Sequence, residues 1–144
     1  MNNPAGRRVQ VAVGVFVFDV AGYLLLVRRG RNPGKGLWTI PGGKVEFGET
    51  LTAACAREVT EETGLSITAG RFVTVFERID ARYHYVIIDY CARVADRRPP
   101  LRAADDAIDA RWADVANLSE FQLTDGLIPV VPLALSIATG DGAI

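Results

Sequence analysis

The stretch GGKVEFGETLTAACAREVTEETGL, residues Gly42–Leu65, decides the fold of this 144-residue chain. It begins with a glycine-containing turn and continues into a helix that we expect over Thr50–Thr63. Apolar residues recur there at every fourth position and form a stripe along one side: Leu51, Cys55 and Val59. Thr50 suits the N-cap of this helix, and Gly64 stands where a C-cap glycine belongs.

The same helix carries several carboxylates near its C-terminal end. Glu58 and Glu62 are four residues apart and therefore project from one face, with Glu61 beside them. A row of carboxylates costs little helix stability on a solvated face, so a solvent-exposed acidic face is one interpretation. The other is a site for a hard divalent cation, because Mg²⁺ takes oxygen ligands of this kind.

The residues before the helix favour the metal interpretation. Backbone carbonyls of the Gly42-Gly43 turn can supply further oxygen ligands, and glycine allows a metal or a phosphate to approach closely. Arg57 can pair with Glu61 one turn along the helix, or with Glu49 across the loop, and hold those carboxylates in place.

Nine residues of this stretch match the Nudix box, G-x5-E-x7-R-E-U-x-E-E-x-G-U with U aliphatic. They are Gly43, Glu49, Arg57, Glu58, Val59, Glu61, Glu62, Gly64 and Leu65. The chain therefore resembles the Nudix hydrolases (MutT-like), and the preceding LWTIPGGK is similar to that family as well. The resemblance implies an α/β fold, the Nudix α/β/α sandwich with a central mixed β-sheet. It implies one domain over residues 1–144, with the box at 43–65.

The resemblance also implies a metal site and a reaction. In this family the glutamates of the box helix bind Mg²⁺ or Mn²⁺, and the cation activates a water that attacks a phosphoanhydride in line. The implied ligands are Glu58 and Glu62, with Glu61 contributing and the Gly42 carbonyl nearby. Glu49 would orient groups around the metal or bind a further ion, and Arg57 would be the structural anchor. The general base varies within the family; Asp106 is our candidate, and a solvated loop carboxylate is the alternative.

Substrate contacts are expected from residues on both sides of the box. Arg28 and Arg29 end a strand that faces the loop Gly30–Gly36, where cations can bind a distal phosphate; an exposed basic loop is the alternative. Trp38 either stacks on a base or packs beneath the box, and we favour packing. Phe47 is a further candidate for the substrate wall.

The tracts Tyr83–Tyr90 (YHYVIIDY) and Asp105–Trp112 (DDAIDARW) resemble short bacterial ADP-ribose pyrophosphatase-like proteins. Strand alternation places Tyr83, Tyr85, Ile87 and Asp89 in one row that could line the pocket, with Tyr85 the candidate substrate contact. The chain departs from the longer ADP-ribose enzymes, which carry a proline where Ala81 stands.

The implied reaction is Mg²⁺-dependent hydrolysis of ADP-ribose or a similar nucleotide sugar to a nucleoside monophosphate. One alternative is a nucleoside triphosphate pyrophosphatase, including one that acts on oxidised nucleotides. Another is a non-catalytic domain that senses a nucleotide.

Composition limits the classes of binding partner and of metal site that we expect. A formal net charge of −1 gives no electrostatic argument for a nucleic-acid duplex or an acidic membrane as the main partner, and a metal with a few local cations can bind a nucleotide whatever the net charge. The resemblance to the Nudix hydrolases implies a small nucleotide as the partner, and homodimers are frequent among related enzymes. Two cysteines and a single histidine are too few for a structural zinc site. We expect buried free thiols, no leader segment and a cytoplasmic protein; a disulfide is the alternative.

The remaining elements follow from hydrophobic patterning and turn residues. We expect a hairpin of strands Val9–Phe18 and Tyr23–Arg29, then strands at Leu37–Ile40, Leu65–Glu77, Tyr83–Val94 and Asp109–Trp112, and a final helix at Asp125–Thr139.

Overall fold

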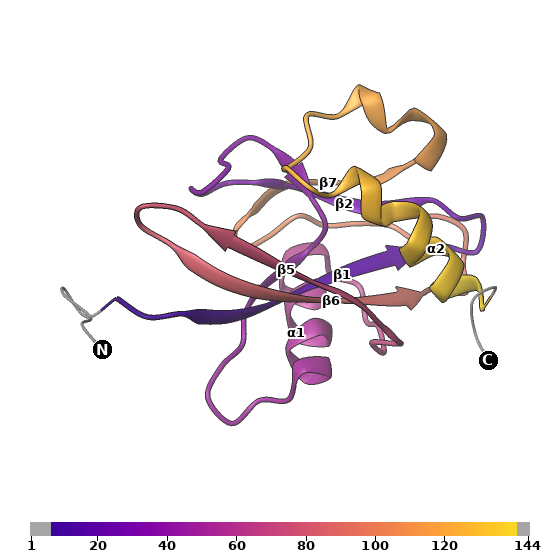
Figure 1. Ribbon diagram of the computed structural model, residues 1–144. Helices are drawn as coiled ribbons and strands as arrows, with labels where there is room; N and C mark the ends of the chain where they lie inside the picture. Colours follow the sequence, from indigo (N-terminus) through magenta and orange to yellow (C-terminus); the bar gives the residue numbers. More distant parts are fainter. Residues whose placement is uncertain (1–6, 141–144) are drawn as a thin grey trace.

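Seven strands form one mixed β-sheet in a computed structural model that describes residues 7–140 (Figure 1). The strands are β1 (Gln10–Phe18), β2 (Leu24–Arg29), β3 (Trp38–Thr39), β4 (Gly42–Lys44), β5 (Phe72–Ile79), β6 (His84–Arg93) and β7 (Ala107–Ala113). The helices are α1 (Leu51–Thr63) and α2 (Val131–Thr139), with short 3₁₀ turns at Val115–Glu120 and Ile128–Val130.

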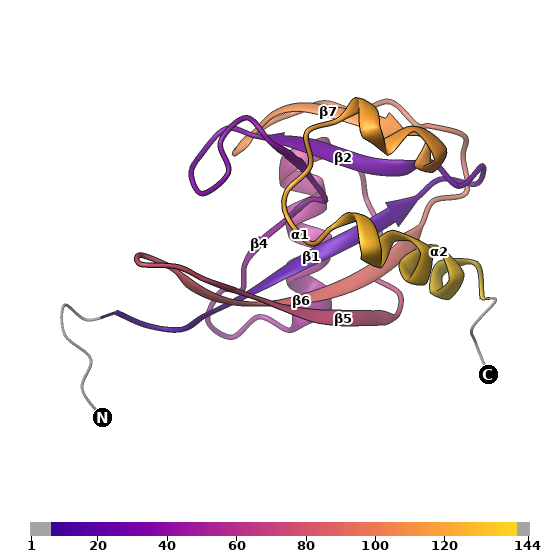
Figure 2. The same cartoon turned by 45° about the horizontal axis from the view of Figure 1, so that its top comes forward.

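The sheet has the order β3-β2-β1-β6-β5, with β4 paired to β1 and β7 paired to β2. β1 and β6 are parallel over their whole paired length, and every other strand pair is antiparallel. Helix α1 covers one face and α2 crosses the other (Figures 1 and 2). The predicted α/β/α sandwich with a mixed sheet is therefore confirmed.

Strand β1 is apolar along most of its length because both of its faces are buried. Val13, Val15 and Val17 pack with α1, whereas Phe16 and Phe18 pack on the α2 side. The alternating pleat of the strand thus divides one apolar run between two cores.

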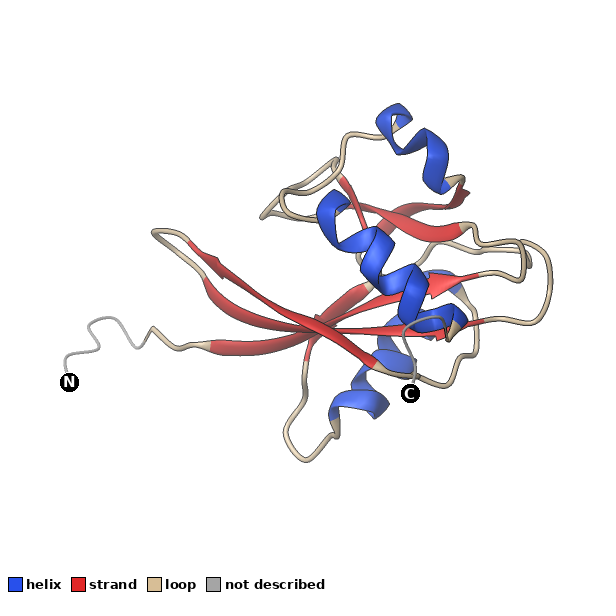
Figure 3. Cartoon of the chain, turned by 45° about the vertical axis from the view of Figure 1, so that its right-hand side comes forward, coloured by secondary structure: helices blue, strands red, loops and turns tan. Residues whose placement is uncertain are grey.

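The expected hairpin of β1 and β2 separates soon after its turn. The two strands are paired only at Phe18 and Leu24; beyond that point β1 pairs with β4, and β2 pairs with β3 and β7. The chain before β4 enters the gap, where the Val15 amide donates to the Pro41 carbonyl at 2.9 Å. The sheet therefore opens between β1 and β2, as Figure 3 shows from the side.

Three other expectations need correction. The segment 65–71 is not a strand, and β5 begins only at Phe72; Leu65, Ile67 and Ala69 alternate because they pack against the α1-side core. The residues expected to form a glycine turn instead form β4. The final helix begins at Val131 rather than Asp125, after the 3₁₀ turn that contains Pro129.

Both cysteines are buried as free thiols in the described part of the chain, as expected. Within residues 7–140, no helix is long and apolar enough to cross a membrane.

The N-cap of α1 provides a test of the local fold. The Thr50 side chain accepts a hydrogen bond from the Ala53 amide at 3.1 Å. Thr50→Ala should lower the free energy of unfolding by about 1 kcal/mol, because the amide loses its partner. Thr52→Ala, at an exposed position inside the same helix, is the control and should be neutral or slightly stabilising. Equal urea midpoints for the two variants would contradict the cap assignment.

Candidate active site

A cavity of about 750 Å³ lies where β1 and β2 diverge. Its walls come from β1, β2, β4, β6 and the acidic face of α1, and the segment 124–127 borders it as well. Of the predicted site residues, Arg29, Gly42, Arg57, Glu58, Glu61, Glu62, Tyr85 and Asp106 line it. The structure therefore brings together residues that are up to 77 positions apart in the chain, from Arg29 to Asp106.

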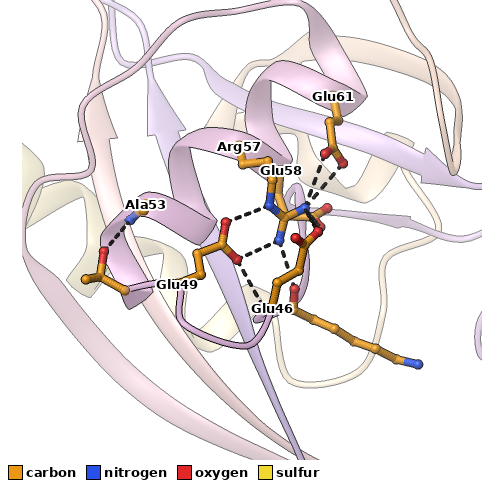
Figure 4. Close-up of polar contacts among 8 residues, drawn as sticks. Glu46, Glu49, Ala53, Arg57, Glu58 and Glu61 are labelled. Atoms are coloured by element: carbon orange, nitrogen blue, oxygen red, sulfur yellow. Dashed lines mark hydrogen bonds and ion pairs between the residues drawn. The ribbon is translucent and has the colours of Figure 1, made fainter.

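Arg57 is the centre of a network of carboxylates beside this cavity (Figure 4). Its guanidinium donates two hydrogen bonds to Glu49, at 2.7 and 2.9 Å, and one to Glu58 at 2.8 Å. It also donates to the Lys44 carbonyl at 3.0 Å, and a longer contact reaches Glu61 at 3.3 Å. Both pairings expected for Arg57, within the helix and across the loop, are present at once.

The pKa of Glu49 reflects this clamp. The Arg57 guanidinium, with help from the Glu46 amide, lowers the pKa of Glu49 to about 2. The same hydrogen bonds raise the pKa of Arg57 above its usual value. Both groups therefore stay charged at every physiological pH, and they tie the loop before α1 to the middle of the helix.

Glu58 and Glu62 are buried, so the solvated-face interpretation does not hold for them. Their exposed fractions are 9% and 6%. Burial raises the pKa of Glu58 against the opposing effect of Arg57, and burial raises the pKa of Glu62 to about 8. Two neighbouring carboxylates held out of water are costly unless a cation arrives to neutralise them.

Strand β4 lies directly against these two carboxylates. The Gly42 amide donates to Glu62 Oε1 at 2.8 Å. A Cβ atom at Gly43 would lie only 2.6 Å from Oε1 and 2.7 Å from Oε2 of Glu58. Glycine is therefore required at position 43 by the close approach of the Glu58 carboxylate rather than by a turn.

The donor set suits a divalent cation of the Mg²⁺ type. Glu58 and Glu62 present carboxylate oxygens to the cavity next to β4. Within residues 7–140 no three His, Cys, Asp or Glu side chains converge on one point. Mg²⁺ does not require three, since it is commonly bound by one or two carboxylates together with waters and substrate phosphates.

Two positively charged side chains also reach the cavity. Arg29 projects from the end of β2 into its wall, and its Nε donates to the Pro33 carbonyl at 2.6 Å. Burial lowers the pKa of Arg29 from its usual value. Arg31 also lines the wall and forms a 2.9 Å ion pair with Asp106.

Four predicted site residues lie outside the cavity wall. Glu49 acts on the site through Arg57. Arg28 is exposed, and its Nε donates to the Gly36 carbonyl. Trp38 is buried, as the packing interpretation expected, but it packs edge-on against Phe121 in the α2-side core, with ring centroids 5.2 Å apart, rather than beneath the box. Phe47 is fully exposed at the tip of its loop, so the structure does not place it in a substrate wall.

The sequence interpretation missed part of the wall opposite α1. Thr39, Phe76 and the segment 124–127 line the cavity there. No local pattern marks them, because their position depends on how β3, β5 and the chain before α2 meet. Asp89 was not missed: it lines the cavity together with Tyr83, Tyr85 and Ile87, the row that strand alternation placed on one face.

Comparison with known proteins identifies the family. The model of the NUDIX domain family matches residues 8–134. The chain belongs to the Nudix family. The match includes the complete box, and Nudix hydrolases generally use divalent metal ions.

Individual Nudix proteins are similar over much of the chain. The ADP-ribose pyrophosphatase of Methanocaldococcus jannaschii is 39% identical over 97 residues, 66% of this chain and 56% of that protein. A bifunctional NMN adenylyltransferase/ADP-ribose pyrophosphatase of Francisella tularensis, solved with AMP and a manganese ion, is 26% identical with a TM-score of 0.75; the match covers 91% of this chain and 42% of that one.

A solved structure of lower sequence identity shares the fold as well. The NUDIX domain of Shewanella oneidensis NrtR is 22% identical with a TM-score of 0.76, covering 92% of this chain and 91% of that one. At this identity the likeness concerns the fold alone. This chain spans 56% of the length of the M. jannaschii relative and 22–38% of the length of other curated relatives that it matches.

The contact between Gly43 and Glu58 predicts the effect of one added methyl group. Gly43→Ala should displace the Glu58 carboxylate and lower kcat/KM for nucleotide hydrolysis by about 100-fold, the loss expected for a misplacement of about 1 Å. Gly22→Ala is the control: its turn meets no atom within 4 Å, and its positive φ reports backbone strain alone. If both variants hydrolysed nucleotides equally well, the close approach would have no catalytic consequence.

The clamp between Arg57 and Glu49 predicts a pH-dependent contribution to stability. The pKa of Glu49 is about 2 in the folded protein and 4.5 for the free side chain, so its contribution is complete above about pH 4.5 and is lost as the pH falls toward 2. Glu49→Gln should therefore be less stable than the parent protein at neutral pH, and the difference should shrink below about pH 4.5. Urea unfolding at several pH values measures it. Glu77→Gln, an exposed carboxylate on β5, is the control, and a difference that grew in acid would contradict the clamp.

Proposed function

We propose that this Nudix hydrolase uses Mg²⁺, with Mn²⁺ as a substitute, to hydrolyse ADP-ribose or a similar nucleotide sugar. The products would be a nucleoside monophosphate and a sugar phosphate. The observation that carries the proposal is the pair of buried carboxylates, Glu58 and Glu62, held at the wall of a cavity by Arg57 and the Gly42 amide.

The similarities support ADP-ribose over the alternatives. Two of the proteins similar to this one, at 39% and 26% identity, are ADP-ribose pyrophosphatases, one of them bifunctional. The cavity of about 750 Å³ also lies within the range of roughly 300–1,000 Å³ typical of small-molecule sites.

Glu58 and Glu62 would hold the cation, with the Gly42 carbonyl and the more exposed Glu61 as further oxygen donors. When bound, the cation supplies charge neutralisation of the pyrophosphate and a water of lowered pKa. Arg57 keeps Glu58 oriented for this task, and Glu49 keeps Arg57 in place.

Two further residues of the cavity wall would act on the substrate itself. Arg29, fixed by the Pro33 carbonyl, would pair with a phosphate oxygen and orient the scissile bond. Asp106 is the candidate general base, because it lines the cavity and its side chain is half exposed, which leaves it open to water. Its ion pair with Arg31 would have to loosen for that role.

The ligand assignment is tested by removing one charge at a time. Glu58→Gln and Glu62→Gln should each abolish Mg²⁺-dependent hydrolysis, because an amide is a poor ligand for Mg²⁺. Neither variant should unfold at a lower temperature, since glutamine keeps the size and one acceptor oxygen of the glutamate while a carboxyl that is costly to bury is removed. Near-native turnover of Glu62→Gln would disprove the assignment. In the same assay Asp106→Asn should lower kcat with little change in KM.

The substrate is tested by product identity. The purified protein is incubated with Mg²⁺ or Mn²⁺ and ADP-ribose, NADH, dinucleoside polyphosphates, or canonical and oxidised triphosphates. AMP and ribose phosphate from ADP-ribose would support the proposal. Release of pyrophosphate from triphosphates, with ADP-ribose left intact, would replace it with the triphosphate alternative.

A further inference from the structure

Asp89 is a buried carboxylate that the metal site does not use. It lies in β6 with an exposed fraction of 7%, and it lines the cavity. Within residues 7–140 no side chain or amide forms a hydrogen bond or ion pair with its carboxylate. Neither carboxylate oxygen is fully enclosed without a partner, so the group faces the cavity space.

Burial of this carboxylate lowers the stability of the folded protein. A carboxyl withdrawn from water without a hydrogen-bond partner costs stability. Burial alone raises the pKa of Asp89 to about 7. No group in the described part of the chain compensates for this cost, which indicates that the partner of Asp89 is a ligand that enters the cavity.

The protein also makes room for this carboxylate. Gly14 of β1 is the register partner of Asp89, and a Cβ atom at position 14 would overlap Asp89 Oδ1. Gly14 is also the partner of Gly42 in β4, so the three residues form one row across the sheet. With strands about 4.8 Å apart, the backbone at Asp89 lies about 10 Å from Gly42, whose amide holds Glu62.

The surroundings of Asp89 are different from those of the metal-binding face. Six apolar side chains line the cavity on this side of the sheet: Phe16, Ile40, Phe76, Ile87, Leu127 and Val130. The polar residues Thr39, Arg78, Thr124 and Asp125 line the same cavity. An anionic phosphate would be repelled by the carboxylate, and a ribose exposes hydroxyls on several sides. A nucleobase combines apolar ring faces with N–H donors confined to its edge, so it is the part of a nucleotide that fits a buried acceptor such as Asp89 beside apolar side chains.

We propose that Asp89 determines base specificity by accepting a hydrogen bond from the exocyclic amine of adenine, while the surrounding apolar side chains contact the ring faces. This inference rests on the proposed function, because it assigns the adenine end of the substrate to the cavity wall on the α2 side of the sheet. It also gives the carboxylates different roles: Glu58 and Glu62 bind the cation at the phosphates, and Asp89 binds the base.

Adenine and hypoxanthine distinguish this role from a structural one. Hypoxanthine carries a carbonyl oxygen in place of the amine, and that oxygen would meet the acceptor Asp89 without a shared hydrogen. A hydrogen bond to a charged group contributes enough for about 10- to 100-fold discrimination. The parent protein should therefore hydrolyse ADP-ribose with a kcat/KM about 10- to 100-fold above that for inosine diphosphate ribose. The assay is run near pH 8.5, above the pKa of Asp89.

Two variants test the assignment independently. Asp89→Leu should raise KM for ADP-ribose by about 10-fold or more with kcat within about twofold, and should reduce the preference for adenine toward unity. Asp89→Asn keeps an acceptor and adds a donor, so it should retain ADP-ribose hydrolysis and gain activity on the inosine compound. Glu77→Gln, an exposed carboxylate on the neighbouring strand β5, should leave both substrates unchanged.

Thermal unfolding separates this role from a structural one. Both Asp89 variants should unfold at the same temperature as the parent protein or higher, since an unpartnered buried carboxyl is removed. Lower unfolding temperatures with an unchanged preference for adenine would overturn the proposal and make Asp89 a packing residue. A fall in kcat at constant KM would also overturn it and place Asp89 in the chemical step.

Calorimetric titration with AMP and with IMP in the presence of Mg²⁺ keeps the two proposals distinguishable. If ADP-ribose is not hydrolysed but AMP binds more tightly than IMP, and Asp89→Asn removes that difference, the proposed function fails and the role of Asp89 stands. If ADP-ribose is hydrolysed but the preference for adenine is the same in all variants, the role of Asp89 fails and the proposed function stands.

Discussion

The site depends on the bidentate pairing of Arg57 with Glu49. This pairing fastens the loop before α1 to the middle of the helix, and the remaining guanidinium nitrogen then holds Glu58 at 2.8 Å. A planar guanidinium can satisfy several carboxylates at fixed angles, which a lysine ammonium cannot do. Arg57 therefore keeps the buried Glu58 carboxylate in position for a cation, and the Gly42 amide does the same for Glu62.

The second constraint is the separation of β1 from β2. Because β1 turns to pair with β4 and β6, while β2 turns to β3 and β7, the centre of the sheet opens into a cavity. Glycines lie on both sides of this opening: Gly43 allows Glu58 to approach β4, and Gly14 allows Asp89 to lie over β1. The acidic face of α1 and the apolar wall on the α2 side thus meet in one cavity, and each suits a different part of a nucleotide.

Much of this could be predicted from local pattern. The apolar stripe of α1, its two caps and the pairing of Arg57 depend on residues close together in the chain, so their spacing is enough to indicate them. The strand 65–71 could not be excluded in the same way, because alternating apolar residues fit either a strand or an irregular segment packed on a core. Phe47 shows a similar limit: an aromatic residue beside the box is exposed, since the loop that carries it points away from the sheet.

By itself, the sequence determined the family, the helix that carries the glutamates and the chemistry those glutamates suit, because all of these lie within 24 consecutive residues. Only the tertiary structure decided which side chains share a cavity. It showed that Glu58 and Glu62 are buried, that Arg29 and Asp106 line the same cavity, and that Asp89 has no hydrogen-bond partner among residues 7–140. The physical reason is that burial and contact depend on which strands pair across the sheet, and residues distant in the chain meet only through that pairing.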